Sequence, residues 1–314
     1  MNQIEVTIND IKYTFPKGIT LEEISKQVEK DYKAKILVGF IDNEMCELTK
    51  KVEKNCKITF KTYLDRSGNR IYQKSLVFLL VYAFKELYGY NYNVKACHSI
   101  DNSIKMKSSM TLTEEIINNL KQKMIEIANQ NLEITKCLVT KKDAIRYFNS
   151  IKDYNKVESL SYLNDKNITL YKINDMYEYF YTLMPISTGV FTSFDLKYIN
   201  ENKFLLQYPV IFKDGSIPEY IERPKVDEAF DEDYKLAKRL KIHNVSDINK
   251  AIADNKHIIS ANSFVKYAFT LTRTESCKIS INNERISLIT VEGDCTLVLT
   301  FSFISPGCEI VVNF

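Results

Sequence analysis

Glycine and proline are scarce in this sequence. Its 314 residues include 8 glycines and 6 prolines, while isoleucine, lysine and asparagine are abundant. A low-complexity linker needs a run of small, polar or proline-rich residues, and this composition leaves none. Domain boundaries must therefore be read from changes in hydrophobic pattern. The length has room for two or three domains, and a hydrophobic content of 45% is ordinary for a globular protein.

Long hydrophobic runs and cysteine motifs are also missing. The most apolar run, Ser75 to Phe84, is about half the length that crosses a bilayer, so it predicts a core helix and no membrane partner. The seven cysteines include no C-x-x-C pair, and no secretory signal leads the chain. These features predict reduced, mostly buried thiols in a cytoplasmic protein.

An excess of one charge is absent as well. Lysine and arginine number 43 against 40 aspartates and glutamates, which gives a formal net charge of +3. A balance this close neither indicates nor excludes a nucleic-acid ligand, because the total can hide a local basic face.

The first sixty residues carry the pattern of a small mixed fold. Apolar and polar residues alternate on both sides of an Asn-Asp turn, which predicts a β-hairpin from Ile4 to Gly18. Thr20 and Glu23 make a capping box before a helical apolar stripe, and further strand patterns follow. The order hairpin, helix, strands predicts a β-grasp unit. This stretch, above all FPKGITLEEI, resembles the TGS domain of threonyl-tRNA synthetases, certain GTPases and stringent-response enzymes.

The residues after Leu64 predict two helices, a strand and a third helix. In the second helix, LTEEIINNLKQKMIEIANQ, we expect one face to meet a core through Ile116, Leu120, Met124 and Ile127. This order resembles the second additional domain of threonyl-tRNA synthetase. It more closely resembles the same domain in bacterial uridine-kinase-related proteins, where TGS, this domain and a kinase domain lie in series. The resemblance covers roughly residues 1 to 255.

The expected fold class is therefore α+β, in four segments. They are a β-grasp (TGS) domain at 1–63, an additional-domain-like domain at 64–212, a helical connector at 213–258 and a β-rich segment at 259–314. The connector ends in a short helix with Ser246 as its N-cap. Strand-forming residues from Phe264 to Phe314 predict a β-meander, with a degenerate start of a kinase domain as the alternative. In either case the body of a kinase is missing.

The resemblance also bears on catalysis. Editing by the synthetase domain depends on an H-x-x-x-H pair on a helix, joined by a later cysteine and histidine. The matching positions hold Lys74 and Phe78, then Phe180 or Tyr181 and Met184. None of these side chains binds zinc or relays a proton at neutral pH as histidine does. We therefore predict no catalytic residue, no metal ligand and no cofactor.

Cys97 and His98 are neighbours in sequence and could suggest a nucleophile and its base. Adjacent residues of a strand point to opposite faces, so we expect a structural Cys97 and a partly exposed His98. In the kinase-linked relatives this segment lines a cleft. The resemblance thus makes His98 a candidate for ligand binding.

The stretch ISLITVEGDCTLVLT partly fits a phosphate-binding loop. Gly293 and Thr300 occupy the first and last fixed positions of G-x-x-x-x-G-K-[ST], but Val298 and Leu299 replace the second glycine and the lysine. The pattern favours a turn between two strands, with a degenerate phosphate loop as the alternative.

A local basic cluster is the remaining candidate. Arg66, Arg70 and Lys74 gather at the start of a long helix with Tyr63 and Tyr72, and nucleic acids favour such mixtures of cations and aromatic faces. The alternative is a solvated helix edge. We predict a non-catalytic protein that binds RNA or a nucleotide, or that regulates a nucleotide enzyme. A truncated or split uridine kinase that acts with a separate kinase chain is the second interpretation, and a structural subunit is the third.

Overall fold

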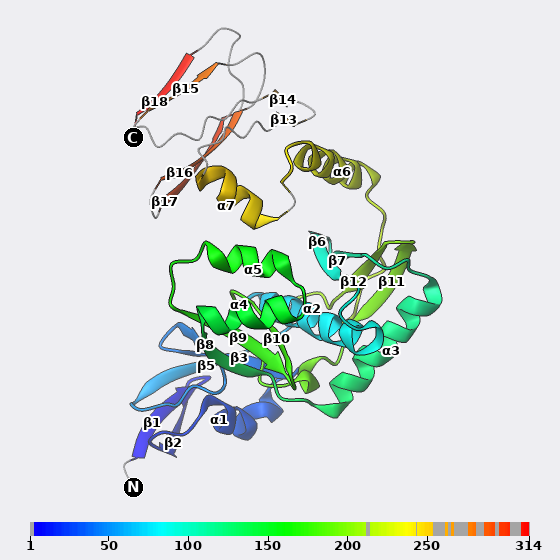
Figure 1. The fold of residues 1–314 in the computed structure, drawn as a ribbon. Coiled ribbons are helices and arrows are strands. Elements are labelled where there is room, and N and C mark those ends of the chain that lie inside the picture. Colours follow the sequence, from blue (N-terminus) through cyan, green and yellow to red (C-terminus); the bar gives the residue numbers. More distant parts are fainter. Residues whose placement is uncertain are drawn as a thin grey trace. The chain divides into compact units, whose positions relative to one another are not determined.

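The computed structural model describes residues 3–211, 214–242 and 244–253, and beyond these the backbone of strands between residues 261 and 313. It confirms an α+β fold that begins with strands (Figure 1). The chain divides into two compact units, one of residues 1–144 and 166–220 and one of residues 145–165 and 221–314. The four segments expected from the sequence are a different division, which stays a prediction.

The first unit begins with a five-stranded sheet in the order β2-β1-β5-β3-β4. Its strands are β1 (Gln3–Ile8), β2 (Ile11–Pro16), β3 (Ile36–Ile41), β4 (Glu44–Cys46) and β5 (Cys56–Thr62). β1 and β5 run parallel, and the other neighbours run antiparallel. Helix α1 (Leu21–Val28) and the short η1 (Glu29–Asp31) follow the first hairpin, and α1 shares a buried core with the sheet. This is the predicted β-grasp arrangement.

Local sequence signals explain how this part forms. The hairpin turn places Asn9 and Asp10 at φ of 49° and 64°, a left-handed conformation that Asn and Asp tolerate better than most residues. At the start of α1, Thr20 Oγ1 accepts the Glu23 N–H at 3.2 Å, and the Glu23 carboxylate accepts the Thr20 N–H at 2.9 Å. The predicted capping box is confirmed. The apolar stripe of the helix consists of Leu21, Ile24 and Val28, and all three are buried.

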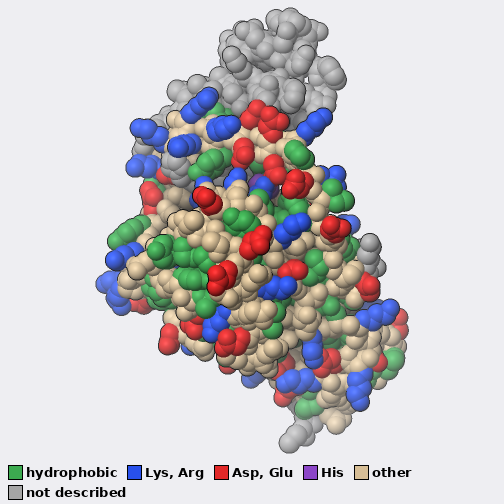
Figure 2. All heavy atoms as spheres, turned by 90° about the vertical axis from the view of Figure 1, so that its right-hand side faces the viewer, with side chains coloured by type: hydrophobic (Ala, Val, Ile, Leu, Met, Phe, Trp, Pro, Cys, Tyr) green, Lys and Arg blue, Asp and Glu red, His purple; other side chains and the backbone are tan. Residues whose placement is uncertain are grey.

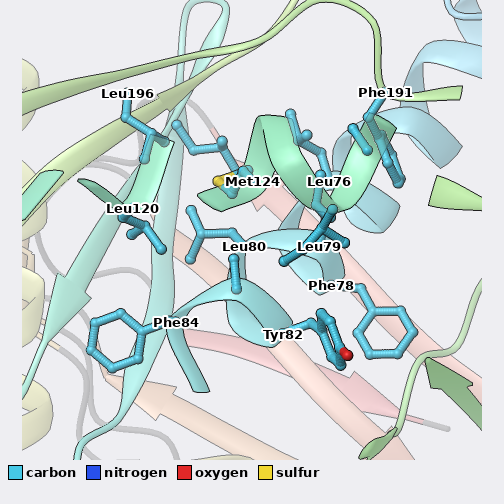
Figure 3. Close-up of a cluster of buried hydrophobic side chains, with 14 of the residues drawn as sticks. Leu76, Phe78, Leu79, Leu80, Tyr82, Phe84, Leu120, Met124, Phe191 and Leu196 are labelled. Atoms are coloured by element: carbon cyan, nitrogen blue, oxygen red, sulfur yellow. The ribbon is translucent and has the colours of Figure 1, made fainter. Parts of the chain in front are cut away.

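Helices α2 (Arg66–Tyr88) and α3 (Glu114–Gln130) pack on one face of a four-stranded antiparallel sheet. The sheet has the order β11-β12-β7-β6 and consists of β6 (Val94–Ile100), β7 (Ser103–Ser108), β11 (Asp195–Asn200) and β12 (Lys203–Gln207). Leu80 of α2, Met124 of α3 and Leu196 of β11 belong to one buried cluster (Figure 3). The apolar run in α2 is a core helix, as predicted. Among the described helices, none is both long enough and apolar enough to cross a membrane.

The buried face of α3 differs slightly from the prediction. Leu120, Met124 and Ile127 are buried as expected, but Ile117 is buried and Ile116 is only partly buried. A core-facing helix stripe includes both i+3 and i+4 positions, so Ile117 lies three residues before Leu120 on the same face. Ile116 still packs against the buried cluster from the edge of this face, so the predicted face is correct and Ile117 is the residue that the prediction leaves out.

A three-stranded antiparallel sheet completes the first unit. It has the order β10-β9-β8, with β8 (Thr135–Thr140), β9 (Asn167–Ile173) and β10 (Met176–Glu178), and the short helix η2 (Thr188–Val190) follows. The Tyr171 hydroxyl donates a hydrogen bond to the Glu47 carboxylate, and Lys136 Nζ lies 3.2 Å from the same carboxylate. Burial and the carboxylate raise the pKa of Tyr171. These contacts join the β-grasp part to the sheet.

The second unit contains the end of α4 (Lys141–Ser150), then α5 (Tyr154–Ser161), α6 (Pro224–Arg239) and α7 (Val245–Ala253). The side chains of Asn155 and Asn244 form a hydrogen bond of 3.0 Å. Ser246 lies inside the first turn of α7, so the prediction that it is the N-cap is wrong. Asn244 directly precedes the helix, and its N–H donates a hydrogen bond to Asp247 Oδ2 at 2.9 Å.

The end of the chain is rich in strands, as predicted. They are β13 (Ala261–Asn262), β14 (Val265–Lys266), β15 (Ser276–Ser280), β16 (Ile286–Glu292), β17 (Cys295–Phe301) and β18 (Glu309–Asn313). β16 pairs with β17, but β15 pairs with β18. The predicted β-meander is therefore wrong, because these strands are nested and not paired in consecutive order. Strand propensity reports a preference for extended backbone and carries no information about the partner.

Candidate nucleic-acid interface

Three cations lie on one side of α2. Arg66, Arg70 and Lys74 are four residues apart, so their side chains project from successive turns of the helix. All three are exposed, and their side chains form no hydrogen bond or ion pair with the described residues. Like charges at this spacing repel each other by a few tenths of a kcal/mol per pair. We call these three residues the α2 cation stripe.

The start of α2 is anchored to the β-grasp sheet. The Asp65 carboxylate accepts the Thr62 N–H at 2.9 Å and lies 3.3 Å from Lys61 Nζ. Gly68 packs on the same turn, where a Cβ atom would lie 2.0 Å from the Thr62 carbonyl oxygen, so only glycine fits. The end of α2 that carries Arg66 is therefore held rigidly against β5.

Tyr63 and Tyr72 are not part of this surface, so the prediction that they supply aromatic faces among the cations is wrong. Tyr72 is 0% exposed and Tyr63 is 8% exposed. Their ring centroids lie 5.1 Å apart, and the Tyr72 hydroxyl donates to the Ser193 carbonyl at 2.8 Å. Burial raises the pKa of Tyr72. Residue 72 lies two positions from Arg70 and from Lys74, so it projects from the opposite side of the helix.

An exposed tyrosine, packed on a partly buried one, lies next to α2 instead. Tyr181 is 82% exposed, and its ring centroid lies 4.7 Å from that of Tyr179 at an interplanar angle of 61°. Between them, Phe180 packs on Phe78 of α2 with ring centroids 5.5 Å apart. The sequence carries a signal for this arrangement, because tyrosines alternate with other residues in MYEYFYTLM. Successive side chains of an extended segment face opposite sides, so Tyr179 and Tyr181 share one side and Phe180 faces the other.

Phe78, Phe180 and Met184, which the resemblance singles out as expected counterparts of editing residues, all lie along one stretch of α2. Phe78 contacts Phe180, and the Met184 sulfur lies 3.0 Å from the Ser75 hydroxyl oxygen. Phe78 and Met184 are buried, whereas Lys74 faces solvent. Within the part of the chain that the structure describes, no group of three or more His, Cys, Asp or Glu side chains could hold a metal ion. The apolar side chains of Phe78, Phe180 and Met184 occupy the positions where the editing residues would be expected.

His98 is partly exposed, as expected, but it lies on another surface. It is opposite Lys105 in the pairing of β6 with β7, so it shares the sheet face of Lys105. The neighbouring Met106 belongs to the other face, which is buried in the same cluster as α2. The structure therefore does not bring His98 together with the α2 cation stripe.

The cysteines are less buried than the sequence predicts. Cys97 is exposed at a β-bulge, where the register of β6 shifts between Ala96 and His98. The thiols of Cys46, Cys56 and Cys137 are of intermediate burial. Partial burial raises the pKa of Cys46 and of Cys56. The prediction of mostly buried thiols is wrong for residues 3–211, because these cysteines occupy a bulge, strand ends and an edge strand.

The two positions of the degenerate phosphate loop fall in the β16–β17 region. Gly293 lies outside the described residues, and Thr300 lies within β17 opposite Ser287. Glu292 pairs with Cys295, so antiparallel strands flank Gly293 on both sides. A phosphate-binding loop instead joins a strand to a helix.

Charges of both signs occur on the face drawn in Figure 2 and in the wall of a cleft. On the face drawn in Figure 2, lysine and arginine side chains are interspersed with aspartates and glutamates. A cleft of about 670 Å³ between α1 and the end of α3 is also lined by side chains of both charges. Its wall contains the ion pairs Lys26–Glu22 at 2.6 Å and Lys35–Glu29 at 2.7 Å. None of the predicted site residues lines this cleft.

Comparison with known proteins relates the chain to one class of enzyme, although no family model matches it. It is similar to the threonine--tRNA ligase of Clostridium kluyveri, with 26% identity over 243 residues, 73% of this chain and 38% of the relative. The same enzyme of a Geobacillus species gives 26% identity over 246 residues, 74% of this chain and 38% of the relative. That of Francisella philomiragia gives 31% identity over 165 residues, 51% of this chain and 26% of the relative.

The first two matches cover about three quarters of this chain, and all three cover less than two fifths of the relative. The chain therefore contains a region related to threonine--tRNA ligases that extends over 73% of its length.

Proposed function

We propose that this protein binds RNA, with a tRNA as its ligand, and catalyses no reaction of its own. The α2 cation stripe carries the proposal, since Arg66, Arg70 and Lys74 are exposed and unpaired among the described residues. Phosphate groups are the counter-ions that such a stripe would bind. The relatives are enzymes named for tRNA, which supports tRNA as the RNA to test first. Binding would take place in the cytoplasm, where the cysteine pattern also predicts the protein.

The absence of catalysis is supported by the side chains next to the stripe. Phe78, Phe180 and Met184 contain no group that can act as a base or as an activated nucleophile. Mischarged seryl-tRNA tests this part directly. We expect it to lose its serine at the same rate with the protein as in buffer alone, and a faster loss would contradict the non-catalytic assignment.

The binding part is tested by reversing the stripe. The triple variant Arg66→Glu, Arg70→Glu, Lys74→Glu should weaken tRNA binding, because it replaces three attractive charges with three repulsive ones. Each phosphate contact contributes roughly 0.7–0.9 to the slope of log K against log salt concentration. The slope should therefore fall by about 2–3 if all three cations contact phosphates.

A matched control separates the stripe from net charge. Lys30, Lys33 and Lys54 are exposed lysines whose side chains form no ion pair with the described residues, and reversing all three changes the net charge equally. This control should bind tRNA more tightly than the stripe variant and keep most of the salt slope. Equal affinities of the wild type and the stripe variant would show that α2 presents only a solvated edge.

A further inference from the structure

Tyr181 is the most exposed large hydrophobic side chain of the described residues, at 82%. A single exposed aromatic ring needs no functional explanation. Tyr181 differs from a single ring because Tyr179 contacts it at 4.7 Å and 61°. Such an edge-to-face contact supports the ring from one side and leaves a ring face open to solvent.

The backbone around Tyr181 is held against α2. Phe180 packs on Phe78, and Met184 is buried with its sulfur 3.0 Å from the Ser75 hydroxyl oxygen. These contacts fix the chain immediately before Tyr181 and three residues after it. A ring held in this way loses little conformational entropy when a ligand stacks on it.

The same contacts place the segment that carries Lys74 next to the segment that carries Tyr181. Lys74 directly precedes Ser75, and Tyr181 directly follows Phe180. The segments that carry Lys74 and Tyr181 are therefore packed side by side, and both side chains face solvent. An exposed aromatic face next to exposed cations is the combination that single-stranded nucleic acid binds, because bases stack on the ring and phosphates meet the cations.

We infer that Tyr179 and Tyr181 form a stacking platform for an unpaired RNA base, next to the α2 cation stripe. The inference rests on the proposed RNA-binding function and specifies the ligand, which must offer an unpaired base and not only a duplex surface. Stacking on tyrosine tolerates any base, because every base has an aromatic face. The platform therefore adds affinity for single-stranded RNA without selecting a sequence.

Fluorescence gives a direct test, because the chain contains no tryptophan. The variant Tyr181→Trp keeps a stacking ring and introduces a single indole. Titration with single-stranded oligo(A) and oligo(U) should quench its emission in a saturable manner. Tyr154→Trp is the matched control, since Tyr154 is 63% exposed but lies at the start of α5. The control should not be quenched at the same concentrations.

Affinity for tRNA gives the second readout. Tyr181→Ala should weaken binding by roughly 5- to 150-fold, the range that removal of one stacked base contact gives. The salt dependence should not change, because no charge is removed. Tyr181→Phe should bind as the wild type does, because the ring and not the hydroxyl carries the contact.

The outcomes separate the platform from the cation stripe. If neither oligonucleotide quenches Tyr181→Trp, or if Tyr181→Ala binds tRNA like the wild type, the platform is overturned. The proposed function still stands in that case if reversal of the stripe weakens binding. Quenching of Tyr181→Trp together with an unaffected stripe variant would support the platform and remove the stripe from the interface.

Discussion

At the scale of single residues, the buried hydroxyl of Tyr72 limits the pH range of the fold. Burial raises the pKa of Tyr72 above its ordinary value of 10.0, so the folded protein keeps this side chain neutral. The unfolded chain releases the proton at lower pH than the folded protein does. The stabilising contribution is therefore complete below pH 10 and is lost as the pH rises above that value.

The predicted consequence is a steep loss of stability at alkaline pH. We expect the free energy of unfolding to fall above pH 10 by up to about 1.4 kcal/mol per pH unit for Tyr72. Urea denaturation at several pH values between about 8 and 11 measures this slope. Tyr72→Phe should make the fall of the free energy of unfolding less steep by up to about 1.4 kcal/mol per pH unit, the contribution of one proton. An unchanged slope in this variant would show that Tyr72 does not titrate differently in the two states.

Gly68 is a second residue with a defined role. The variant Gly68→Ala places a methyl group against the Thr62 carbonyl oxygen, which belongs to rigid backbone. We expect a loss of about 1–3 kcal/mol in the free energy of unfolding. Ser67→Ala, at the preceding helix position, should change it by less than about 0.5 kcal/mol. Chemical denaturation compares the two variants, and equal stabilities would contradict the close packing at Gly68.

At the residue scale, the positions of the three cations follow from helix spacing alone, while their role in binding stays a prediction. Arg66, Arg70 and Lys74 share one side of α2 because they are four residues apart. Closeness in sequence alone groups Tyr63 and Tyr72 with these cations, and that criterion ignores the rotation of the helix. The exposed Tyr181 belongs to a segment more than one hundred residues later, so only tertiary structure places it beside α2.

At the scale of secondary-structure elements, α1 depends on its capping box. Thr20→Ala removes the acceptor of the Glu23 N–H, and such a loss costs about 1 kcal/mol. We expect that decrease in the free energy of unfolding. Gln27→Ala, at an exposed position of the same helix, should have an effect below about 0.5 kcal/mol. Thermal or urea unfolding of both variants tests the cap, and a Thr20→Ala variant as stable as the control would contradict it.

Elements with local signals were the predictable ones. The turn at Asn9 and Asp10 and the cap of α1 involve residues within four positions of each other, so the sequence contains all the required information. The bulge at Cys97 and the pairing of β15 with β18 depend on partners elsewhere in the chain. Propensity cannot supply those partners, because every strand offers the same backbone groups.

At the scale of the molecule, Glu47 couples the β-grasp part to the sheet of β8 and β9. In Glu47→Ala, the buried Tyr171 hydroxyl loses its acceptor, which costs about 1–3 kcal/mol. We expect faster amide hydrogen exchange in residues 3–62, because this part then opens more easily. Glu53→Ala is the control, since its ion pair with Lys17 at 3.9 Å is exposed and contributes little. Unchanged exchange in Glu47→Ala would show that other contacts provide the coupling.

The whole chain also offers a test of the alternative function. A uridine kinase, or a chain that shares ATP with a kinase partner, must bind ATP with magnesium. We expect no shift of the melting temperature with this ligand, because leucine occupies the lysine position of the phosphate-loop pattern at Leu299. A shift that saturates with ATP concentration would favour the kinase interpretation.

The parallel pairing of β1 with β5 has a consequence for synthesis on the ribosome. Val6 of β1 pairs with Cys56, which is added fifty residues later. At a translation rate of about 5–20 residues per second, β1 remains without this partner for roughly 3–10 seconds. During that time its edge is open to wrong pairing, and the hairpin with β2 is too small to be stable alone. Slow codons after residue 62 would give the β-grasp part time to close before α2 emerges, so the speed of translation in this region should affect the yield of folded protein.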